Sequence, residues 1–466
     1  KLYIIFIELY YNKTINYNKT IIIDMSFQDF YSKNFLINLL ISIIPISYIA
    51  GNLVLNLNII ILLISALSIY RLEIFKLELE LIDKIILIFF SYILLNGIFN
   101  NFLNFSFIKA PDNIVLIKTI FYLRFLLLYF VIKFLINKKI INFKIIFFSF
   151  GFCSLFVCID LLIQFIFEKD IFGYEGKGRR LSGPFGDEYV AGSFIQRFFI
   201  FLPFAFLLFF KNKRNWVVQT TLLLTLGLSM SGVLLAGNRI PLLLFVLILS
   251  MIFIYQKSYR KTLMLLLIIF ITSFTFLINS NKHSKDHLHN FMFRSSQIFD
   301  YAKTRITTGE VKALNVYIKE IEAGILTWKE NKYFGGGIKS FWWNCNKIDR
   351  SKMAGFVTRT GEVNCNIHPH NYYLEILAEI GLVGLFLIIS LFFIICIKAL
   401  RKIHLSKMIT DDNEKLIPFF IIFFAEIFPL KTTGSFFTTS NATFLFIILA
   451  FIVGLIELKS SKNDEK

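Results

Sequence analysis

The chain alternates between long apolar stretches and short polar connections. A helix of about 18–20 apolar residues is long enough to span a bilayer, and this criterion predicts about twelve spans. We place them near residues 35–50, 53–70, 85–104, 114–134, 145–167, 190–210, 216–236, 240–256, 262–279, 371–397, 416–430 and 442–458. Pro45, Pro418 and Pro429 predict kinks or breaks in the first and eleventh spans. The expected fold class is therefore an all-α integral membrane protein, a polytopic helical bundle.

The composition agrees with this assignment. Hydrophobic residues make up 56% of the 466 positions, charged residues only 17%, and there are 57 phenylalanines. The mean hydropathy is +0.68. A soluble domain of this size does not need so much apolar surface, so the composition excludes a soluble enzyme.

The basic residues predict the orientation of the bundle. With the N-terminus inside, the cytoplasmic connections carry most of the lysines and arginines, whereas the short outer turns hold single ones, Lys109, Arg239 and Lys431. This is a positive-inside pattern, and it explains much of the formal net charge of +18. No nucleic-acid-binding motif accompanies the charge. We therefore expect membrane lipids, and not nucleic acid, as partners.

The spans divide the chain into five segments. We expect a cytoplasmic N-terminal segment at 1–34, within which Met25 offers an alternative start, and an N-terminal bundle of about nine spans at 35–279. A large outer loop at 280–369 is too long for a simple connector and is expected to be functional. About three further spans at 370–458 and a cytoplasmic tail at 459–466 complete the chain. No cleavable signal peptide is evident.

Two cysteines lie in the outer loop. Cys345 and Cys365 are twenty residues apart, and in an oxidising compartment they could form a disulfide that braces the loop just ahead of His368. A metal site is the weaker interpretation, because neither cysteine has a partner at CxxC spacing.

The segment Ile367–Glu375 holds two of the six histidines, at the junction between the polar loop and a hydrophobic helix. A histidine at the membrane boundary titrates near neutral pH and can act as a general base. His370 and Asn371 open the helix, where free N–H groups favour anions. The alternative is that His368 and His370 simply cap the helix. Glu379 lies nine residues further on, well inside the bilayer.

Four arginines are candidate anion-binding groups. Arg179 and Arg180 stand beside a Gly-rich turn and suit a phosphate or diphosphate, although a solvated loop that contacts lipid headgroups fits equally. Arg197 lies inside a span, where an arginine faces a polar cavity or a partner unless it snorkels. Arg239 is held in a tight outer turn, on the side where basic residues are otherwise rare. This exception favours an anion-binding role.

Other polar groups favour structural roles. Asp160 and Gln164 share a helix face and favour a polar network between the fourth and fifth spans, with Lys118 and Arg124. Glu426 is more readily paired than catalytic.

Several glycines and histidines carry weaker signals. The three glycines at 335–337 favour a closely packed backbone turn over a phosphate loop, because no Walker lysine follows. Gly381 and Gly384 would let another helix approach. His283, His287 and His289 give only a weak metal signal, because no carboxylate set accompanies them.

Together these segments resemble the O-antigen ligase and polymerase family of polytopic membrane glycosyltransferases. The resemblance covers roughly residues 145–458, and Pro369-His370-Asn371-x2-Leu374-x2-Leu377-x-Glu379-x-Gly381 is its most specific motif. It also rests on Asp160-x3-Gln164, Arg180 to Phe185, Gly237-Asn238-Arg239, Phe334 to Gly337 and Thr433-Gly434-Ser435. Asn238 stands where the family usually has serine, and the proline expected before the glycine turn is absent.

The resemblance implies a bundle of twelve spans with a large periplasmic loop over the active site, in a bacterial inner membrane. The donor would be an undecaprenyl-diphosphate-linked glycan, and the acceptor a sugar hydroxyl on lipid A core or on another glycan. Arg180 and Arg239 would hold the diphosphate, and His370 would deprotonate the acceptor for one inverting displacement. No metal, nucleotide sugar or other cofactor would be needed. These motifs do not separate a ligase from a polymerase.

A lipid-linked oligosaccharide flippase or another polysaccharide transporter is the alternative from a different class. It predicts internal repeats and ionisable residues along a midplane pathway. The chain shows no convincing repeat, and its candidate residues collect at the outer edge.

Overall fold

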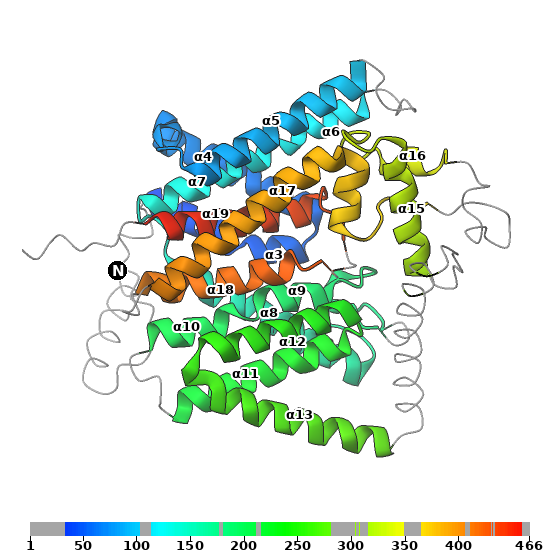
Figure 1. The fold of residues 1–466 in the computed structure, drawn as a ribbon. Helices are drawn as coiled ribbons and strands as arrows, with labels where there is room; N and C mark the ends of the chain where they lie inside the picture. The colour runs from blue at the N-terminus through cyan, green and yellow to red at the C-terminus, as the bar shows by residue number, and fades with distance from the viewer. Residues whose placement is uncertain are drawn as a thin grey trace, which may run out of the picture.

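The structure is a computed structural model that describes residues 33–102, 113–176, 180–210, 216–280, 303, 307, 316–348, 365–405, 411–429, 431 and 434–458. Across these residues the chain is helical, and the only β-type pairing described is an isolated bridge between Lys169 and Glu175. Figure 1 shows the long helices lying side by side. The predicted all-α class is confirmed.

The helices follow one another in a simple order, and several meet end to end. They are α2 (Lys33–Ser42), α3 (Ile44–Ile49), α4 (Asn52–Tyr70), η2 (Arg71–Lys76), α5 (Leu81–Phe102), α6 (Ile114–Tyr122), α7 (Arg124–Asn137), α8 (Phe143–Phe167), η3 (Gly183–Phe185), α9 (Ala191–Phe198), α10 (Phe201–Phe209), α11 (Trp216–Leu235), α12 (Arg239–Tyr255), η4 (Lys257–Tyr259), α13 (Arg260–Ser280), α15 (Val316–Glu330), α16 (Phe341–Cys345), α17 (Tyr372–Leu405), α18 (Asp411–Glu426) and α19 (Thr439–Glu457).

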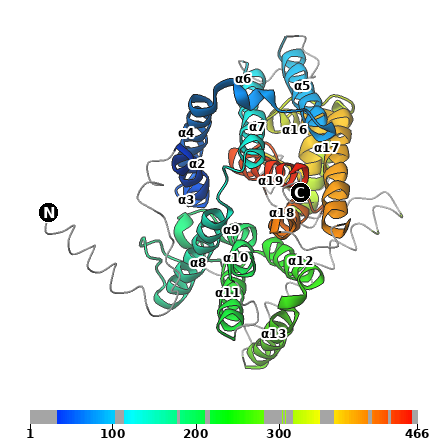
Figure 2. The same ribbon diagram turned by 90° about the vertical axis from the view of Figure 1, so that its left-hand side faces the viewer.

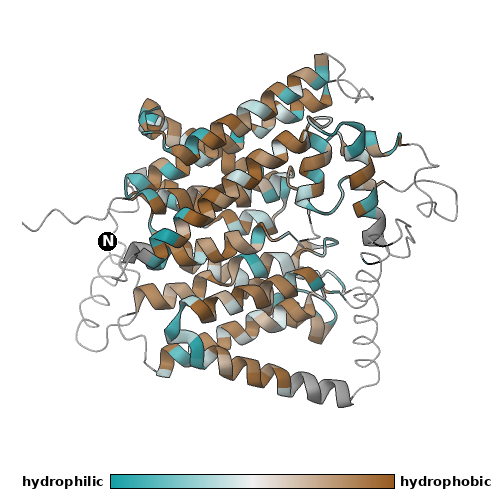
Figure 3. Ribbon diagram, viewed as in Figure 1, coloured by the Kyte–Doolittle hydropathy of each residue, from teal (hydrophilic) through white to brown (hydrophobic). Residues whose placement is uncertain are grey.

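Among the described residues, eight helices or helix runs are long and apolar enough to cross a membrane. A ninth is added if α12 and the first part of α13, which meet at a bend of 112°, count as one broken span. Hydrophobic residues follow the helices and hydrophilic ones gather at their ends (Figure 3). The chain is thus a polytopic membrane protein, but the predicted count of twelve spans is not confirmed.

The difference in count arises where helices are short or broken. The predicted span 35–50 is divided at Ile43 into α2 and α3, and Pro45 occupies the first turn of α3. The predicted span 416–430 is α18, which ends at Glu426 shortly before Pro429. Pro418 lies inside α18 without ending it. Two of the predicted breaks therefore occur, and each lies just before its proline, Pro45 or Pro429. Proline lacks the N–H that a helix interior needs, so it is tolerated at a helix end.

Helix α19 lies at the centre of the bundle. It packs against α7, α17 and α18, and Figures 1 and 2 both show it among them. Every residue from Ala442 to Leu455 is buried. A helix that is apolar on all sides is stable only when it is enclosed. The apolar run in 442–455 is compatible with this enclosed position, which places α19 in contact with α7, α17 and α18.

A buried charged group fixes the end of the bundle far from α15. Lys133 of α7 contacts the carboxylates of Asp83 (2.5 Å) and Glu457 (2.7 Å), which belong to α5 and α19. Tyr129 donates a hydrogen bond to the other Asp83 oxygen at 2.7 Å. Because each charge is compensated by a different helix, this cluster joins three helices where they end.

Helices α15 and α16 lie at the other end of the bundle (Figure 1) and are held to α17 by a glycine turn. The Gly337 N–H donates to the Glu379 carbonyl at 2.6 Å, and the Leu382 N–H donates to the Lys332 carbonyl at 3.0 Å. Helix α17 is kinked here, because Gly381 has φ 68° and ψ −171°. The prediction of a closely packed turn at 335–337 is therefore confirmed.

The predicted role of Gly381 and Gly384 is corrected by this contact. A Cβ on Gly381 would lie 2.2 Å from the Tyr333 carbonyl oxygen, so a loop backbone approaches this glycine, and not another helix. A Cβ on Gly384 would meet only Ile380 of its own helix.

Substituting Gly381 by alanine should destabilise the fold. The positive φ and the clash with the Tyr333 backbone together predict a loss of about 2–5 kcal/mol in the free energy of unfolding. Thermal unfolding of the purified protein in detergent would show it as a lower melting temperature. Gly227→Ala in α11 is the matched control, since its nearest contact would be Leu266 at 3.8 Å. Equal melting temperatures for the two variants would contradict the proposed role of this contact.

Candidate functional site

A cavity of about 1030 Å³ opens at the end of the bundle that carries α15. Its wall is formed by helix ends and connections: the turn after α3, the segment before α9, the start of α12, one residue of α15, the histidine turn before α17 and the connection before α19. These segments are far apart in sequence. They meet because successive antiparallel spans return alternate connections to one end of the bundle.

The cavity brings together most of the predicted site residues. Arg180, Arg197, Arg239, His368 and His370 all line it. Arg179 lies outside the described residues, as do His283, His287 and His289. Within the described ranges, no group of three or more histidine, cysteine, aspartate or glutamate side chains is arranged to hold a metal ion.

The histidine turn is shaped by backbone strain and by an asparagine cap. His370 has φ 49°, a left-handed conformation that is uncommon outside glycine. The Asn371 side-chain oxygen accepts from the Tyr373 and Leu374 N–H groups at 3.0 and 3.2 Å, and its amide donates to the Pro429 carbonyl at 2.9 Å. Asn371 therefore caps α17, and the histidine side chains are left for the cavity.

Both histidines are held towards their neutral form. Burial lowers the pKa of His368 to about 4, with His370 and Lys339 acting in the same direction. Burial also lowers the pKa of His370, against the opposing effect of Glu375. The centroids of the two imidazole rings are 4.3 Å apart. A neutral imidazole that reaches a cavity can accept a proton from a bound hydroxyl.

A carboxylate from α15 faces His370. The Glu320 Oε1 atom lies 3.7 Å from His370 Nε2. Burial raises the pKa of Glu320 to about 7, and a hydrogen bond from Asn366 opposes that shift. The sequence analysis did not single out Glu320. It lies on α15, where helical periodicity alone does not indicate which carboxylate turns inward.

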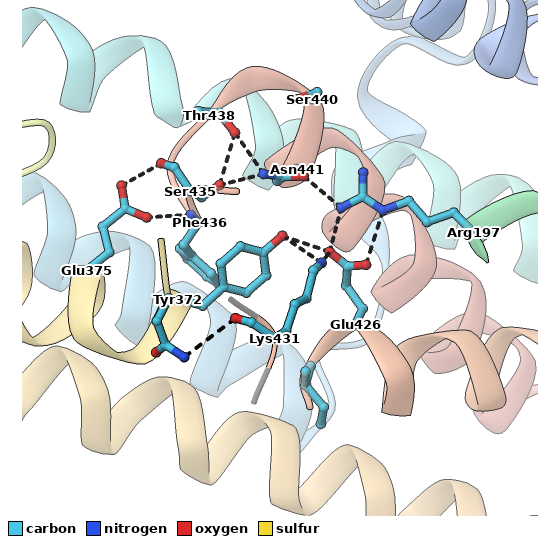
Figure 4. Close-up of polar contacts among 12 residues, drawn as sticks. Arg197, Tyr372, Glu375, Glu426, Lys431, Ser435, Phe436, Thr438, Ser440 and Asn441 are labelled. Carbon is cyan, nitrogen blue, oxygen red and sulfur yellow. Dashed lines mark hydrogen bonds and ion pairs between the residues drawn. The ribbon is translucent and has the colours of Figure 1, made fainter. Parts of the chain in front are cut away.

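Arg197 lies at the floor of the cavity in a buried polar network (Figure 4). Its Nη2 and Nε atoms contact the two Glu426 oxygens at 2.7 and 3.1 Å, and Nη2 also donates to Asn441 at 2.6 Å. The Tyr372 hydroxyl donates to Glu426 Oε1 at 2.7 Å. Arg197 is buried and paired, so snorkelling is excluded, and the pairing predicted for Glu426 is confirmed.

Lys431 adds a second cation to the same carboxylate. Its Nζ atom forms an ion pair with Glu426 and a hydrogen bond of 3.1 Å to the Tyr372 hydroxyl. The side chain is 5% exposed and lines the cavity. In the sequence, the feature that could have indicated a site role for Lys431 is that it is the single basic residue of a short outer turn. Two basic side chains therefore share one carboxylate at the cavity floor, where burial lowers the pKa of Lys431 to about 7 against the opposing effect of Glu426.

Arg180 and Arg239 stand on segments that are anchored by neighbouring side chains. The Asp160 carboxylate accepts from the Ile171 N–H at 2.8 Å, and Gln164 accepts from the Gly183 N–H at 2.9 Å, so both hold the segment that carries Arg180. Asn238, next to Arg239, donates to the Tyr189 carbonyl at 2.7 Å.

The predicted network between the fourth and fifth spans is wrong. The hydrogen bonds of Asp160 and Gln164 go to the following loop, and Arg124 donates to Thr439 at 3.1 Å.

Two further carboxylates hold neighbouring segments of the backbone in place and do not line the cavity. Glu379 accepts from the Lys339 N–H at 2.7 Å and is fully buried, so it holds the glycine turn on α17. Glu375 accepts from the Ser435 hydroxyl and the Phe436 N–H, both at 2.5 Å, and thereby fixes the connection before α19 (Figure 4).

The predicted disulfide is confirmed. Cys345 and Cys365 are bonded, with their Cα atoms 6.0 Å apart. Both cysteines pack in a small cluster with Ala323 of α15 and Ala378 of α17. The bond therefore secures the segment that leads into the histidine turn.

Comparison with protein families gives a match to part of the chain. Residues 222–389 match the family model described as O-antigen ligase. The matched region contains Arg239, Glu320 and His370, and it ends within α17. No curated protein matches the chain.

Replacing Glu426 by glutamine should strongly destabilise the protein, because it leaves Arg197 and Lys431 buried without a counter-charge. Breaking a buried ion pair in this way costs about 3–5 kcal/mol. The measurement is the melting temperature of the purified variant in detergent. Glu330→Gln at the exposed end of α15 serves as the control. A Glu426→Gln protein as stable as this control would refute the structural importance of the network.

Proposed function

We propose that this chain, a member of the O-antigen ligase family through residues 222–389, is a membrane glycosyltransferase of cell-surface polysaccharide or lipopolysaccharide assembly. The reaction moves a glycan from an undecaprenyl-diphosphate-linked donor to a sugar hydroxyl. The observation that carries the proposal is the single cavity lined by His370, Arg180, Arg197 and Arg239. A base and several cations in one cavity suit the transfer of a group from a diphosphate to a hydroxyl.

His370 acts as the general base. Its neutral imidazole takes the proton from the acceptor hydroxyl, and the acceptor oxygen forms a bond to the anomeric carbon of the donor. The bond between that carbon and the diphosphate oxygen breaks, and its electron pair leaves with the diphosphate. One displacement of this kind inverts the anomeric configuration. No metal ion or nucleotide takes part.

The cations stabilise the departing diphosphate. Arg180 and Arg239 offer guanidinium groups, which bind phosphate oxygens with two parallel hydrogen bonds. Beneath them, the Arg197 guanidinium and the Lys431 amine, which share Glu426, line the same cavity. Cations that are already fixed where negative charge develops lower the barrier, because they need no reorganisation during the reaction.

The active site faces the periplasm in this proposal. The cavity lies at the end with α15, whereas the C-terminal ends of α7, α12 and α17 lie at the opposite end (Figure 1). Lys138, Lys257 and Lys398 belong to that opposite end, and such residues favour the cytoplasmic side of an inner membrane. Ile49, Leu55, Phe194 and Val190 give the cavity an apolar wall for the lipid part of the donor.

The acceptor is either a lipid A core, as for a ligase, or another glycan chain, as for a polymerase. Both present a sugar hydroxyl to His370. Transfer assays with each acceptor distinguish the two enzymes, and movement of the donor lipid without transfer would instead indicate a flippase.

Substituting His370 by alanine should reduce glycan transfer by about 10²–10⁴-fold, the usual contribution of a positioned general base. Mass spectrometry of the product formed from a lipid-diphosphate-linked glycan and a defined acceptor measures the rate. Binding of the donor should be retained. His404→Ala, at the exposed far end of α17, is the control. Transfer at the unmodified rate by His370→Ala would rule out this residue as the base.

Substituting Arg180 or Arg239 by glutamine should lower kcat/KM for the donor by about ten- to a hundredfold each, since a hydrogen bond to a charged group contributes roughly 1.5–3 kcal/mol. Titration of the donor in the transfer assay gives this value for each variant. Arg401→Gln, at the exposed cytoplasmic end of α17, is the matched control. Unchanged kcat/KM in both variants would remove the argument for diphosphate binding.

A further inference from the structure

Glu320 projects from α15 towards the histidine that the proposed reaction uses as its base. Its Oε1 atom is 3.7 Å from His370 Nε2, which is an ion-pair distance, and its side chain is 12% exposed. The same oxygen accepts a hydrogen bond of 2.5 Å from the Asn366 amide. Asn366 belongs to the short segment that leads into the histidine turn. The carboxylate is thus held from one side and faces the imidazole on the other.

The backbone of α15 is packed against the histidine turn itself. A Cβ on Gly324, one helical turn after Glu320, would lie 3.3 Å from Pro369 Cβ and 3.4 Å from Leu374 Cβ. A larger residue at 324 would push α15 away from the turn. The disulfide between Cys345 and Cys365 also holds the segment that leads into the histidine turn. These contacts fix the separation between Glu320 and His370.

The other carboxylates near His370 already have partners. Glu375 accepts from Ser435 and Phe436, and Lys339 lies 3.4 Å from it. Glu426 is shared between Arg197 and Lys431. Glu320 is the carboxylate that lines the cavity beside the imidazole.

We propose that Glu320 is the positioning residue of His370: its carboxylate orients the imidazole and stabilises the imidazolium that forms when His370 takes the acceptor proton. The inference rests on the proposed function. Nε2 faces the ionised Glu320 carboxylate, and the other ring nitrogen accepts the proton of the hydroxyl. The carboxylate itself stays ionised throughout the step. A buried carboxylate that orients a histidine base is an established arrangement in hydrolytic enzymes.

The surrounding charges determine how the pair responds to pH. Burial favours a neutral His370, and Glu375 favours its protonated form. Of the charged groups around the ring, Lys339, Lys431 and the three cavity arginines oppose a positive charge on His370, whereas Glu320, at 3.7 Å, favours one. The reactive state combines a neutral His370 with an ionised Glu320. Because burial raises the pKa of Glu320 to about 7, the carboxylate becomes protonated as the pH falls through that value. The transfer rate should therefore decline below about pH 7.

The first test is the pH profile of glycan transfer by Glu320→Gln. We expect a rate about ten- to a hundredfold below that of the unmodified protein, less than the loss of the base itself would cause. The decline near pH 7 should disappear, and the rate should fall only when His370 is protonated at lower pH. Glu320→Asp should restore part of the rate and the decline near neutrality. Glu330→Gln on the same helix is the control and should keep the full rate.

The second test does not require transfer activity. Diethyl pyrocarbonate modifies neutral imidazoles, and mass spectrometry gives the rate of modification of His370 at about pH 8, where Glu320 is ionised and His370 is neutral. An ionised carboxylate within about 4–6 Å makes an imidazole more basic, so His370 should react severalfold more slowly in Glu320→Gln at this pH. The Glu330→Gln protein should react at the rate of the unmodified chain. Equal melting temperatures ensure that the folded proteins are compared, and Glu320→Asp replaces the glutamine variant if that one does not fold.

The two proposals fail in different ways. If the unmodified protein does not transfer glycan, the proposed function fails, and the modification experiment still decides whether Glu320 and His370 interact. If transfer depends on His370 but Glu320→Gln keeps both the full rate and the pH profile, the positioning role is wrong and the proposed function stands. An unchanged rate of His370 modification at about pH 8 in Glu320→Gln overturns the inference in either case.

Discussion

Charge buried inside an apolar bundle must be compensated, and the site end of this molecule is organised around one such compensation. Glu426 of α18 receives Arg197 from α9, Lys431 from the connection before α19 and the Tyr372 hydroxyl from α17. No two of these partners come from the same segment. An uncompensated charge here would cost several kcal/mol, so the four segments are constrained to meet at one point. The cavity floor follows from that constraint.

At the opposite end of the bundle, buried charge is also compensated, but there the acidic groups outnumber the basic one. There Lys133 lies between Asp83 and Glu457, so two carboxylates surround one cation. Helix α19 runs between the two clusters and is buried along its apolar length. The two clusters therefore tie both ends of the central helix to its neighbours. Only the cluster of two basic side chains and one carboxylate lines the described cavity, and basic groups are what an anionic substrate requires.

Local sequence patterns predicted the features that are determined within a single segment of the chain. Apolar length located most of the helices, and the spacing of Cys345 and Cys365 allowed the disulfide. The meeting of Arg180, Arg239 and His370 also followed, because the parity of antiparallel spans sends their connections to one end. Glu320 and Lys431 were missed as site residues, since their partners lie 50 residues away along the chain in one case and on two different helices in the other. Asp160 and Gln164 were misassigned for the same reason: a helix face does not reveal which loop folds back on it.

The cavity is assembled from two parts with different supports. Arg180, Arg197 and Arg239 stand on the bundle helices and on the loops tied to them. Glu320 and His370 stand on segments fastened by the disulfide, by the close approach of the turn at 333–335 to the backbone at 379–381, and by the packing of Gly324 on Pro369. In the proposed reaction the first part binds the donor diphosphate and the second part activates the acceptor. Because the second part is attached to α17 mainly through backbone contacts, side chains facing the acceptor are free to vary without disturbing the turn that holds His370. The donor part has no such freedom, since Arg197 also compensates a buried charge. The acceptor side of the cavity is therefore where differences in glycan specificity can arise at the least cost to the fold.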